Sequence, residues 1–218
     1  MDSKLQIISG KFKGKKLEWP PSARPTSMRA KIALFNILMP IVKEIVSQKA
    51  TDLSIPTPSV PTNPHREGDL TVWDAFAGSG AFGAEFISRG LASSVIFTDS
   101  DPAAVKIIRN NLKDMTGSSS ITIEKAKMIE VAGKYAPKAG IIFLDPPYSE
   151  GKKLANTITS LSKFMKKDAI LIVEYENIES PAATLNTQWT PAFAGVTNLE
   201  TLTIRKYGRA GFAIFRKV

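Results

Sequence analysis

The sequence predicts an α/β fold in which helices cover both faces of a largely parallel sheet. Two observations carry this prediction. Five apolar or β-branched runs alternate with helical patterns through the middle of the chain, and such alternation is typical of parallel strands joined by crossover helices. Two further strand-like runs near the end are joined by a glycine-containing turn, which predicts an antiparallel hairpin at the end of the sheet.

The predicted elements begin with an N-terminal segment that precedes the alternating region. Residues 5–9 are expected to form a strand, and residues 10–16 a basic stretch punctuated by glycines. Residues 27–46 then have the pattern of a helix. The buried face of this helix is expected to consist of Ile32, Leu34, Phe35, Ile37 and Leu38.

The alternating region supplies the remaining elements. Its strands are expected at residues 70–75, 95–99, 121–124, 141–145 and 170–174. Its helices are expected at residues 81–90, 101–115 and 152–165. The final hairpin is expected to pair residues 199–206 with residues 211–217.

Two proline-punctuated stretches, residues 49–68 and 180–198, lack periodicity and predict surface loops or insertions. The only histidine, His65, lies in the first of them, where a solvated side chain is a better interpretation than a general base. The chain is therefore divided into a basic N-terminal extension (1–48), a proline-rich loop (49–68) and an α/β domain (69–218).

Composition and charge narrow the function classes. The chain has no cysteine, which excludes disulfides and thiolate metal sites, and no apolar run of membrane-spanning length. We expect a cytoplasmic protein without a bound metal. The net charge is +9, with eight basic and two acidic residues among the first 31, and five basic and no acidic residues among the last 18. Basic ends around a slightly acidic middle indicate a polyanionic partner such as nucleic acid.

A glycine-rich turn, Asp74-Ala-Phe-Ala-Gly-Ser-Gly-Ala-Phe-Gly83, follows the first strand of the α/β domain. Such a turn lets a ligand approach the backbone at the start of a helix. Asp74 is placed to accept hydrogen bonds from an ammonium group or from the turn's own N–H groups. Asp99 ends the next strand, where it can accept from ribose hydroxyls. Enzymes that bind NAD share these features, so the turn alone does not identify the ligand.

The sequence Asp145-Pro146-Pro147-Tyr148 follows an apolar strand, and so is expected on the same sheet edge as the glycine turn. An exocyclic base amine is a poor nucleophile, because its lone pair is delocalised into the ring. The Asp145 carboxylate and the Pro146 carbonyl can each accept one N–H of such an amine. The lone pair of the amine nitrogen then points toward the molecule that supplies the transferred group. Consecutive prolines stiffen the turn, and Tyr148 offers a face on which a flipped base can stack. We interpret these four residues as catalytic.

These motifs resemble those of class I methyltransferases that act on amino groups, and most closely the bacterial 16S ribosomal RNA guanine-N2 methyltransferase family of the guanine-966 type. The resemblance covers most of the chain. Its residues are Ile7–Leu17, Arg24-Pro25-Thr26, Arg29, Leu34-Phe35-Asn36, Asp74, Gly78-Ser79-Gly80, Gly83, Glu85, Asp145–Tyr148, Val173-Glu174 and Lys206-Tyr207-Gly208.

The resemblance implies a Rossmann-like class I methyltransferase fold with a seven-stranded sheet. It implies methyl transfer from S-adenosylmethionine to the N2 amine of a guanine in 16S rRNA, by a monomer acting within a 30S subunit or assembly intermediate. The cofactor-binding residues it implies are Asp74, Phe76, Gly78, Ser79, Gly80, Gly83, Asp99, Ser100, Lys127 and Met128. The RNA-binding residues are Lys11, Lys13, Lys15, Arg24 and Arg29.

One position departs from the family pattern. Members often carry Asp or Asn before the helix that follows the third strand, where it meets the adenine amine, whereas this chain has Lys127, which cannot accept that hydrogen bond. Three alternatives stay open at this point: a DNA adenine-N6 methyltransferase, an RNA-binding assembly factor that has lost turnover, and an NAD-dependent oxidoreductase. The last of these does not explain Asp145–Tyr148.

Overall fold

The computed structural model describes residues 5–21, 26–50, 70–115, 117, 119–146, 151–176, 198–208 and 210–218. Its elements, in chain order, are α1 (Met28–Ala50), β1 (Thr71–Asp74), α2 (Ala81–Arg89), β2 (Ser94–Asp99), α3 (Pro102–Leu112), β3 (Ser120–Lys125), α4 (Met128–Tyr135), β4 (Ile141–Leu144), α5 (Gly151–Ser162), β5 (Ile170–Glu176), β6 (Leu199–Tyr207) and β7 (Ala210–Lys217).

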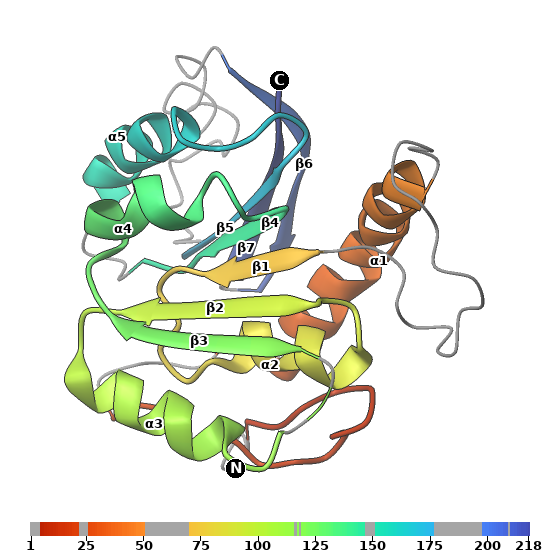
Figure 1. Ribbon diagram of the computed structural model, residues 1–218, viewed down its shortest axis with the longest axis vertical. Helices are drawn as coiled ribbons and strands as arrows, with labels where there is room; N and C mark the ends of the chain where they lie inside the picture. Colours follow the sequence, from red (N-terminus) through yellow and green to blue (C-terminus); the bar gives the residue numbers. More distant parts are fainter. Residues whose placement is uncertain are drawn as a thin grey trace.

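The strands form one seven-stranded sheet in the order β3-β2-β1-β4-β5-β7-β6 (Figure 1). Strands β1 to β5 run parallel to one another, and β7 runs antiparallel to both β5 and β6. The predicted mostly parallel sheet with an antiparallel C-terminal hairpin is confirmed. The strand order reverses direction between β1 and β4, and the carboxyl ends of strands at such a switch point border a ligand-binding crevice.

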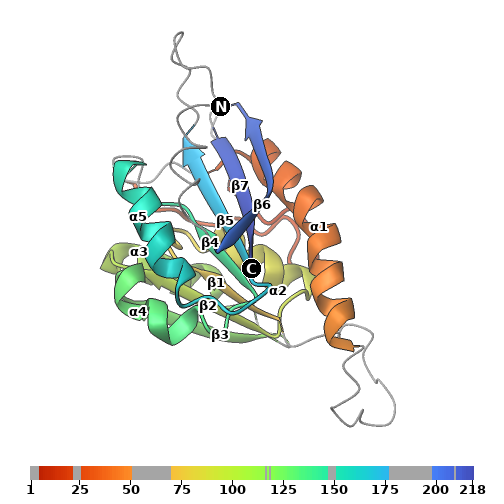
Figure 2. The same cartoon turned by 90° about the horizontal axis from the view of Figure 1, so that it is seen from above.

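Helices cover both faces of the sheet, with α1 and α2 on one side and α4 and α5 on the other (Figures 1 and 2). Alternate residues of each central strand enter separate cores. Val72, Phe143 and Ile172 belong to the core under α1, α2 and α3, while Trp73 and Leu144 belong to the core under α4 and α5. Burial on both faces explains why these strands are continuous apolar runs in the sequence.

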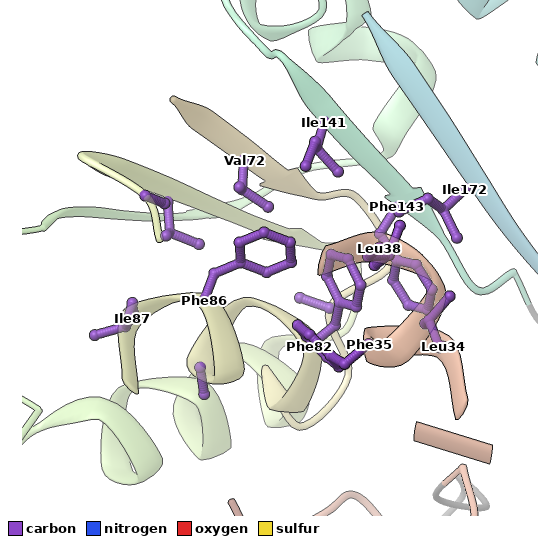
Figure 3. Close-up of a cluster of buried hydrophobic side chains, with 14 of the residues drawn as sticks. Leu34, Phe35, Leu38, Val72, Phe82, Phe86, Ile87, Ile141, Phe143 and Ile172 are labelled. Carbon is purple, nitrogen blue, oxygen red and sulfur yellow. The ribbon is translucent and has the colours of Figure 1, made fainter. Parts of the chain in front are cut away.

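The core under α1 and α2 is rich in aromatic rings. The rings of Phe82 and Phe143 stack with centroids 4.0 Å apart, and those of Phe35 and Phe86 meet at 5.4 Å. Figure 3 shows these side chains gathered between α1, α2 and the sheet. Because α1 contributes Leu34, Phe35 and Leu38 to this core, the N-terminal extension and the α/β domain share one packed interior.

The start of the extension folds as a tight turn, and not as the strand predicted at residues 5–9. Among the described residues of this segment, an isolated bridge joins Gln6 to Lys16, and the N–H groups of Ile7 and Leu17 donate to the carbonyls of Lys15 and Leu5 at 3.0 and 2.9 Å. Gly10 and Gly14 both have positive φ, which closes the chain back on itself within a few residues. The turn packs against α2: the Lys11 N–H donates to the Ser88 carbonyl at 2.6 Å, and a Cβ at Gly10 would collide with that carbonyl.

Three further expectations need correction. Ile32, expected in the core, is 40% exposed. The short helix α4 was not among the predicted helices, and α5 ends at Ser162, before the predicted residue 165. Most of the two proline-punctuated stretches, with His65, falls outside the described residues. Among the described helices, none is long and apolar enough to cross a membrane, and the described side chains form no cluster suited to a metal.

Candidate active site

A cavity opens at the carboxyl edge of the sheet, beside the switch point. Three parts of the chain line it: the N-terminal extension, the glycine turn after β1, and the ends of β1, β4 and β5. The predicted residues among its lining are Asp74, Phe76, Gly78, Ser79 and Asp145. The structure therefore brings the predicted cofactor turn and the predicted catalytic aspartate into one cavity.

The glycine turn depends on backbone angles that glycine adopts without strain. Gly78 has φ +51° and Gly80, which caps the start of α2, has φ +74°. The Gly78 N–H donates to Asp99 Oδ2 at 2.9 Å, and Asp99 Oδ1 accepts from the Asp101 N–H at 2.9 Å. A Cβ at Gly78 would meet nothing within 4 Å, so the space beside it is open to a ligand.

Asp74 ends β1 and is 1% exposed. Its Oδ2 accepts a hydrogen bond from the Gly83 N–H at 3.1 Å, one of the two partner types expected from the sequence. Burial raises the pKa of Asp74 well above its usual value, and the Gly83 hydrogen bond only partly opposes this. Gly83 has a packing role, because a Cβ there would collide with the ring of Phe97.

Asp145 directly follows β4 and is half-buried at the cavity. Burial raises its pKa to about 7. Pro146 is buried beside it, whereas Pro147 and Tyr148 lie outside the described residues. The carboxyl group that we interpret as catalytic is thus poised to change charge close to neutral pH.

Glu174, on β5, lies next to Asp145 and lines the same cavity. Leu144 and Val173 are paired in the β4–β5 register, so the residues that follow them are neighbours across the two strands. Glu174 is 2% exposed, and its carboxylate accepts from the Thr26 hydroxyl at 2.9 Å. Sequence reasoning missed Glu174 as a site residue, although an acid at the end of an apolar strand is the signal that identified Asp74 and Asp145.

The N-terminal extension forms another part of the cavity wall through Leu5, Trp19 and Pro20. Asn111 of α3 ties this wall to the glycine turn. Its Nδ2 donates to the carbonyls of Ser79 and Glu18, each at 2.8 Å, and its Oδ1 accepts the Glu18 N–H at 2.9 Å. Sequence analysis did not identify Asn111, because its partners are 32 and 93 residues away.

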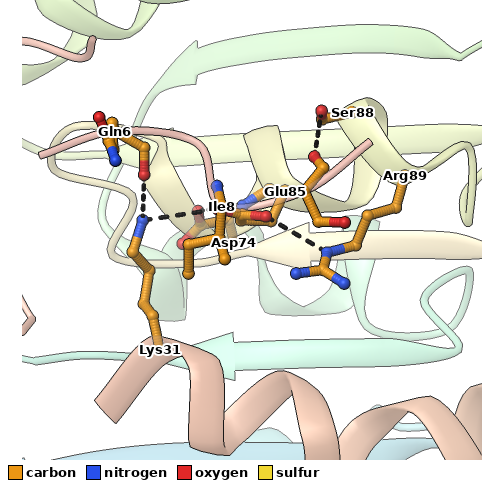
Figure 4. Close-up of polar contacts among 9 residues, drawn as sticks. Gln6, Ile8, Lys31, Asp74, Glu85, Ser88 and Arg89 are labelled. Atoms are coloured by element: carbon orange, nitrogen blue, oxygen red, sulfur yellow. Dashed lines mark hydrogen bonds and ion pairs between the residues drawn. The ribbon is translucent and has the colours of Figure 1, made fainter. Parts of the chain in front are cut away.

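A buried ionic network fixes the extension to α2 (Figure 4). Glu85 Oε1 accepts the Ile8 N–H at 2.6 Å and lies 3.7 Å from Lys31 Nζ, while Oε2 lies 3.2 Å from Arg89 Nε. Lys31 also donates to the Gln6 carbonyl at 3.1 Å. Burial lowers the pKa of Lys31, and Glu85 opposes that effect. Glu85, part of the motif that resembles a cofactor turn, therefore holds the extension in place.

The other predicted cofactor residues lie on the same rim but do not line the cavity. Ser100 is exposed, Asp99 shapes the turn, and the Met128 side chain is buried in the core under α4 and α5. The side chain of Lys127, at the N-cap of α4, is 73% exposed and lies 3.8 Å from Glu130.

Four of the five predicted RNA-binding residues lie in the described part of the extension. Lys11, Lys13 and Arg29 are exposed, and Lys15 is paired with Asp114 at 3.4 Å. Arg24 lies outside the described residues. The three lysines sit on the turn that packs against α2, and Arg29 sits in the first turn of α1.

The residues of the cavity fit S-adenosylmethionine. This molecule carries a cationic sulfonium and an ammonium group, and Asp74, in the cavity lining, offers a carboxylate to a cation. The open space beside Gly78 gives a ligand access to the turn backbone. Each oxygen of Asp99 keeps a lone pair for a ribose hydroxyl after its backbone hydrogen bond.

The chain is similar to several known proteins. A family model described as Conserved hypothetical protein 95 matches residues 5–54 and 62–215. Ribosomal RNA small subunit methyltransferase D of Escherichia coli is 29% identical over 85% of this chain and 81% of its own length. The protein of the same name from Haemophilus influenzae is 30% identical over 79% of each chain.

A solved structure shares the fold. Trm1 of Pyrococcus horikoshii, determined in complex with S-adenosyl-L-methionine, superposes with a TM-score of 0.63 at 14% identity, over 95% of this chain and 59% of that one. The predicted Rossmann-like methyltransferase fold is confirmed.

Proposed function

The chain belongs to the family described as Conserved hypothetical protein 95, and we propose that it transfers a methyl group from S-adenosylmethionine to the exocyclic N2 amine of a guanine in 16S ribosomal RNA. The observation that carries this proposal is that Asp145 shares one cavity with the glycine turn. The names of the relatives, which are ribosomal RNA methyltransferases of the small subunit, support the choice of substrate.

Binding of the donor is assigned to the rim between β1 and β2. Asp74 and the backbone of Gly78 and Ser79 hold the methionine part, and Asp99 holds the ribose. Once bound, S-adenosylmethionine supplies a methyl group on a sulfonium, which is already activated for transfer. The protein therefore contributes mainly position, because aligning two reactants can itself supply a large part of the rate enhancement.

Orientation of the acceptor amine is assigned to Asp145 and Pro146. The carboxylate of Asp145 accepts one N–H of the amine and the carbonyl of Pro146 accepts the other, which aims the nitrogen lone pair away from both acceptors and toward the donor side of the cavity. After transfer, the extra proton on nitrogen leaves through Asp145 or to solvent. Ionised Asp145 is required for this role, and Tyr148 is proposed to stack on the base.

The RNA partner is assigned to the basic surface of the extension. Lys11, Lys13, Lys15, Arg24 and Arg29 are proposed to contact phosphates, which carry most of the affinity in such complexes and make binding salt-dependent. We propose a monomer that acts on a 30S subunit or an assembly intermediate.

A methyl-transfer assay with labelled S-adenosylmethionine tests the proposal. The substrates are protein-free 16S rRNA, 30S particles from cells that lack the protein, and duplex DNA, and the product is mapped by mass analysis of nucleosides. We expect one N2-methylguanine per small-subunit RNA and no product with Asp145→Ala. Methylation of DNA alone would favour the adenine-N6 alternative. Donor binding without product on any substrate would favour the assembly factor.

A further inference from the structure

We propose that Glu174 selects guanine as the methyl acceptor by accepting a hydrogen bond from its N1–H. The inference rests on the proposed function and adds a specificity-determining residue to the same site. The Asp-Pro-Pro-Tyr motif is proposed to bind an amine, and it does not distinguish guanine N2 from adenine N6. Another group must therefore recognise the ring position next to the amine.

The sheet register places Glu174 where that edge would lie. Leu144 and Val173 are partners on the parallel strands β4 and β5, so Asp145 and Glu174 are adjacent at the carboxyl edge. Neighbouring strands are about 4.8 Å apart. Both side chains line the cavity, on the sheet face that also carries Phe143 and Ile172. The two carboxylates are thus side by side and face the same space.

The hydrogen bonding of Glu174 leaves it able to accept more. A carboxylate has about four acceptor sites, whereas Thr26 brings a single hydroxyl hydrogen to its two oxygens. At 2% exposure the group has little access to bulk water, so its remaining capacity is left for a molecule in the cavity. Anchoring Thr26 would not by itself require an acid, because the amide oxygen of glutamine accepts a hydroxyl equally well.

The chemistry of the base matches this pair. Guanine presents N1–H and the N2 amine as adjacent donors, and two adjacent acceptors complement them. Adenine presents an amine next to an unprotonated N1, whose lone pair would face the Glu174 carboxylate. Burial, and then the nearby Asp145, raise the pKa of Glu174 well above its usual value. Guanine donates to both groups and so stabilises the ionised forms that its recognition requires.

The test uses 2-aminopurine, which keeps the exocyclic 2-amine of guanine but has no hydrogen on N1. Small-subunit RNA is assembled by ligation with either guanine or 2-aminopurine at the mapped target, and the methylation rate (kcat/KM) of each is measured. Wild type is expected to favour guanine by at least about 10³-fold, because sites built to bond a group reject analogues that lack it. In Glu174→Gln the amide can donate to the bare N1, so the guanine preference should fall at least about 100-fold.

Two variants separate recognition from folding. Thr26→Val removes the anchor of Glu174 and should slow both substrates equally, with an unchanged preference. Glu174→Asp keeps an acid and should retain the preference at a reduced rate, which keeps the test decisive if Glu174→Gln does not fold.

A guanine preference that stays within about threefold of wild type in Glu174→Gln would overturn the role of Glu174, while methylation of guanine by wild type would leave the proposed function intact. Absence of any rRNA guanine methylation by wild type would overturn both.

Discussion

Glu85 and Asp145 are two carboxylates that differ in the partners that the protein provides for them. Glu85 is fully buried and meets a backbone N–H and two cations, Lys31 and Arg89. Within the described part of the chain, Asp145 has neither a hydrogen-bond donor nor a paired cation, and burial raises its pKa to about 7. A carboxylate such as Glu85, whose hydrogen-bond donors and cations come from the protein, stabilises the fold. A carboxylate such as Asp145, which lacks such partners, can bind a ligand instead.

This difference predicts where each substitution acts. Loss of Glu85 should lower the stability of the fold, because it leaves the buried Lys31 without a counter-charge. Loss of Asp145 should act on the reaction, because its partner is the substrate.

The largest effect is expected on catalysis. Asp145→Ala should lower kcat/KM for rRNA methylation by about 10³- to 10⁴-fold, since it removes an acceptor that orients the amine. Donor affinity, measured by calorimetry, should stay within about threefold of wild type. If Asp145→Ala lost both activity and the binding of S-adenosylmethionine, Asp145 would belong to the cofactor site, and its proposed role at the acceptor amine would be wrong.

The next effect concerns stability. Glu85→Ala should lower the free energy of unfolding by about 3–5 kcal/mol, because Lys31 then remains buried without its counter-charge. Urea unfolding measures this change. Glu44, which lies on the exposed part of α1, 3.1 Å from Arg216, provides a matched control. Glu44→Ala should cost less than about 1 kcal/mol, because exposed ion pairs contribute little. Equal losses in the two variants would contradict the structural role of Glu85.

The pH dependence of the rate follows from the raised pKa of Asp145. Only the ionised carboxylate accepts an amine N–H, and ionisation is lost as the pH falls through about 7. We expect kcat/KM to fall about tenfold per pH unit below that point and to level off above it. A rate that stays flat between pH 5.5 and 8 would show that Asp145 is ionised throughout, as a paired carboxylate would be.

The same shift predicts a cost in stability. Between about pH 4 and 7 the folded protein keeps the Asp145 proton that the unfolded chain has released, so this group's contribution to stability decreases as the pH rises. At pH 8, Asp145→Asn should therefore raise the free energy of unfolding, by about 1–2 kcal/mol after allowance for the part of the side chain that is exposed. Thermal unfolding at pH 5 and pH 8 measures the difference, and a destabilised Asn variant at pH 8 would show that the carboxylate is paired after all.

The residues that sequence reasoning identified are those whose position depends on local order along the chain. Asp74, Asp99 and Asp145 each end an apolar strand, and parallel strands bring such ends to one edge of a sheet. Glu174 also ends an apolar run, so the same signal marked it, but its closeness to Asp145 depends on the β4–β5 register. Asn111 was missed because its role depends on the docking of a distant segment, which no local pattern in the sequence encodes.

The helix α1 shows how a distant charge overrides a local pattern. Its apolar residues predicted a buried Ile32, yet Ile32 is 40% exposed and the neighbouring Lys31 is 5% exposed. The ion pair with Glu85, 54 positions further along the chain, is available only once the extension packs on α2. Lys31 shares one face of the helix with the buried Leu34, Phe35 and Leu38, and Ile32 lies off that face.

The smallest effect is expected at Lys127, an exposed residue of the rim. It occupies the N-cap of α4 but makes no side-chain cap hydrogen bond. Lys127→Asp should stabilise the helix by about 0.5–1 kcal/mol, since aspartate accepts from the free N–H groups there and suits the positive end of the helix.

Lys127→Asp should also tighten the binding of S-adenosylmethionine about three- to tenfold, because a carboxylate can accept from the adenine amine. Lys127→Ala separates the two causes: it removes the lysine without adding an acceptor, so only the aspartate variant should bind the donor more tightly by calorimetry. If Lys127→Ala tightened the binding of S-adenosylmethionine equally, repulsion between the lysine and the cationic cofactor would explain the effect, and a new hydrogen bond would not.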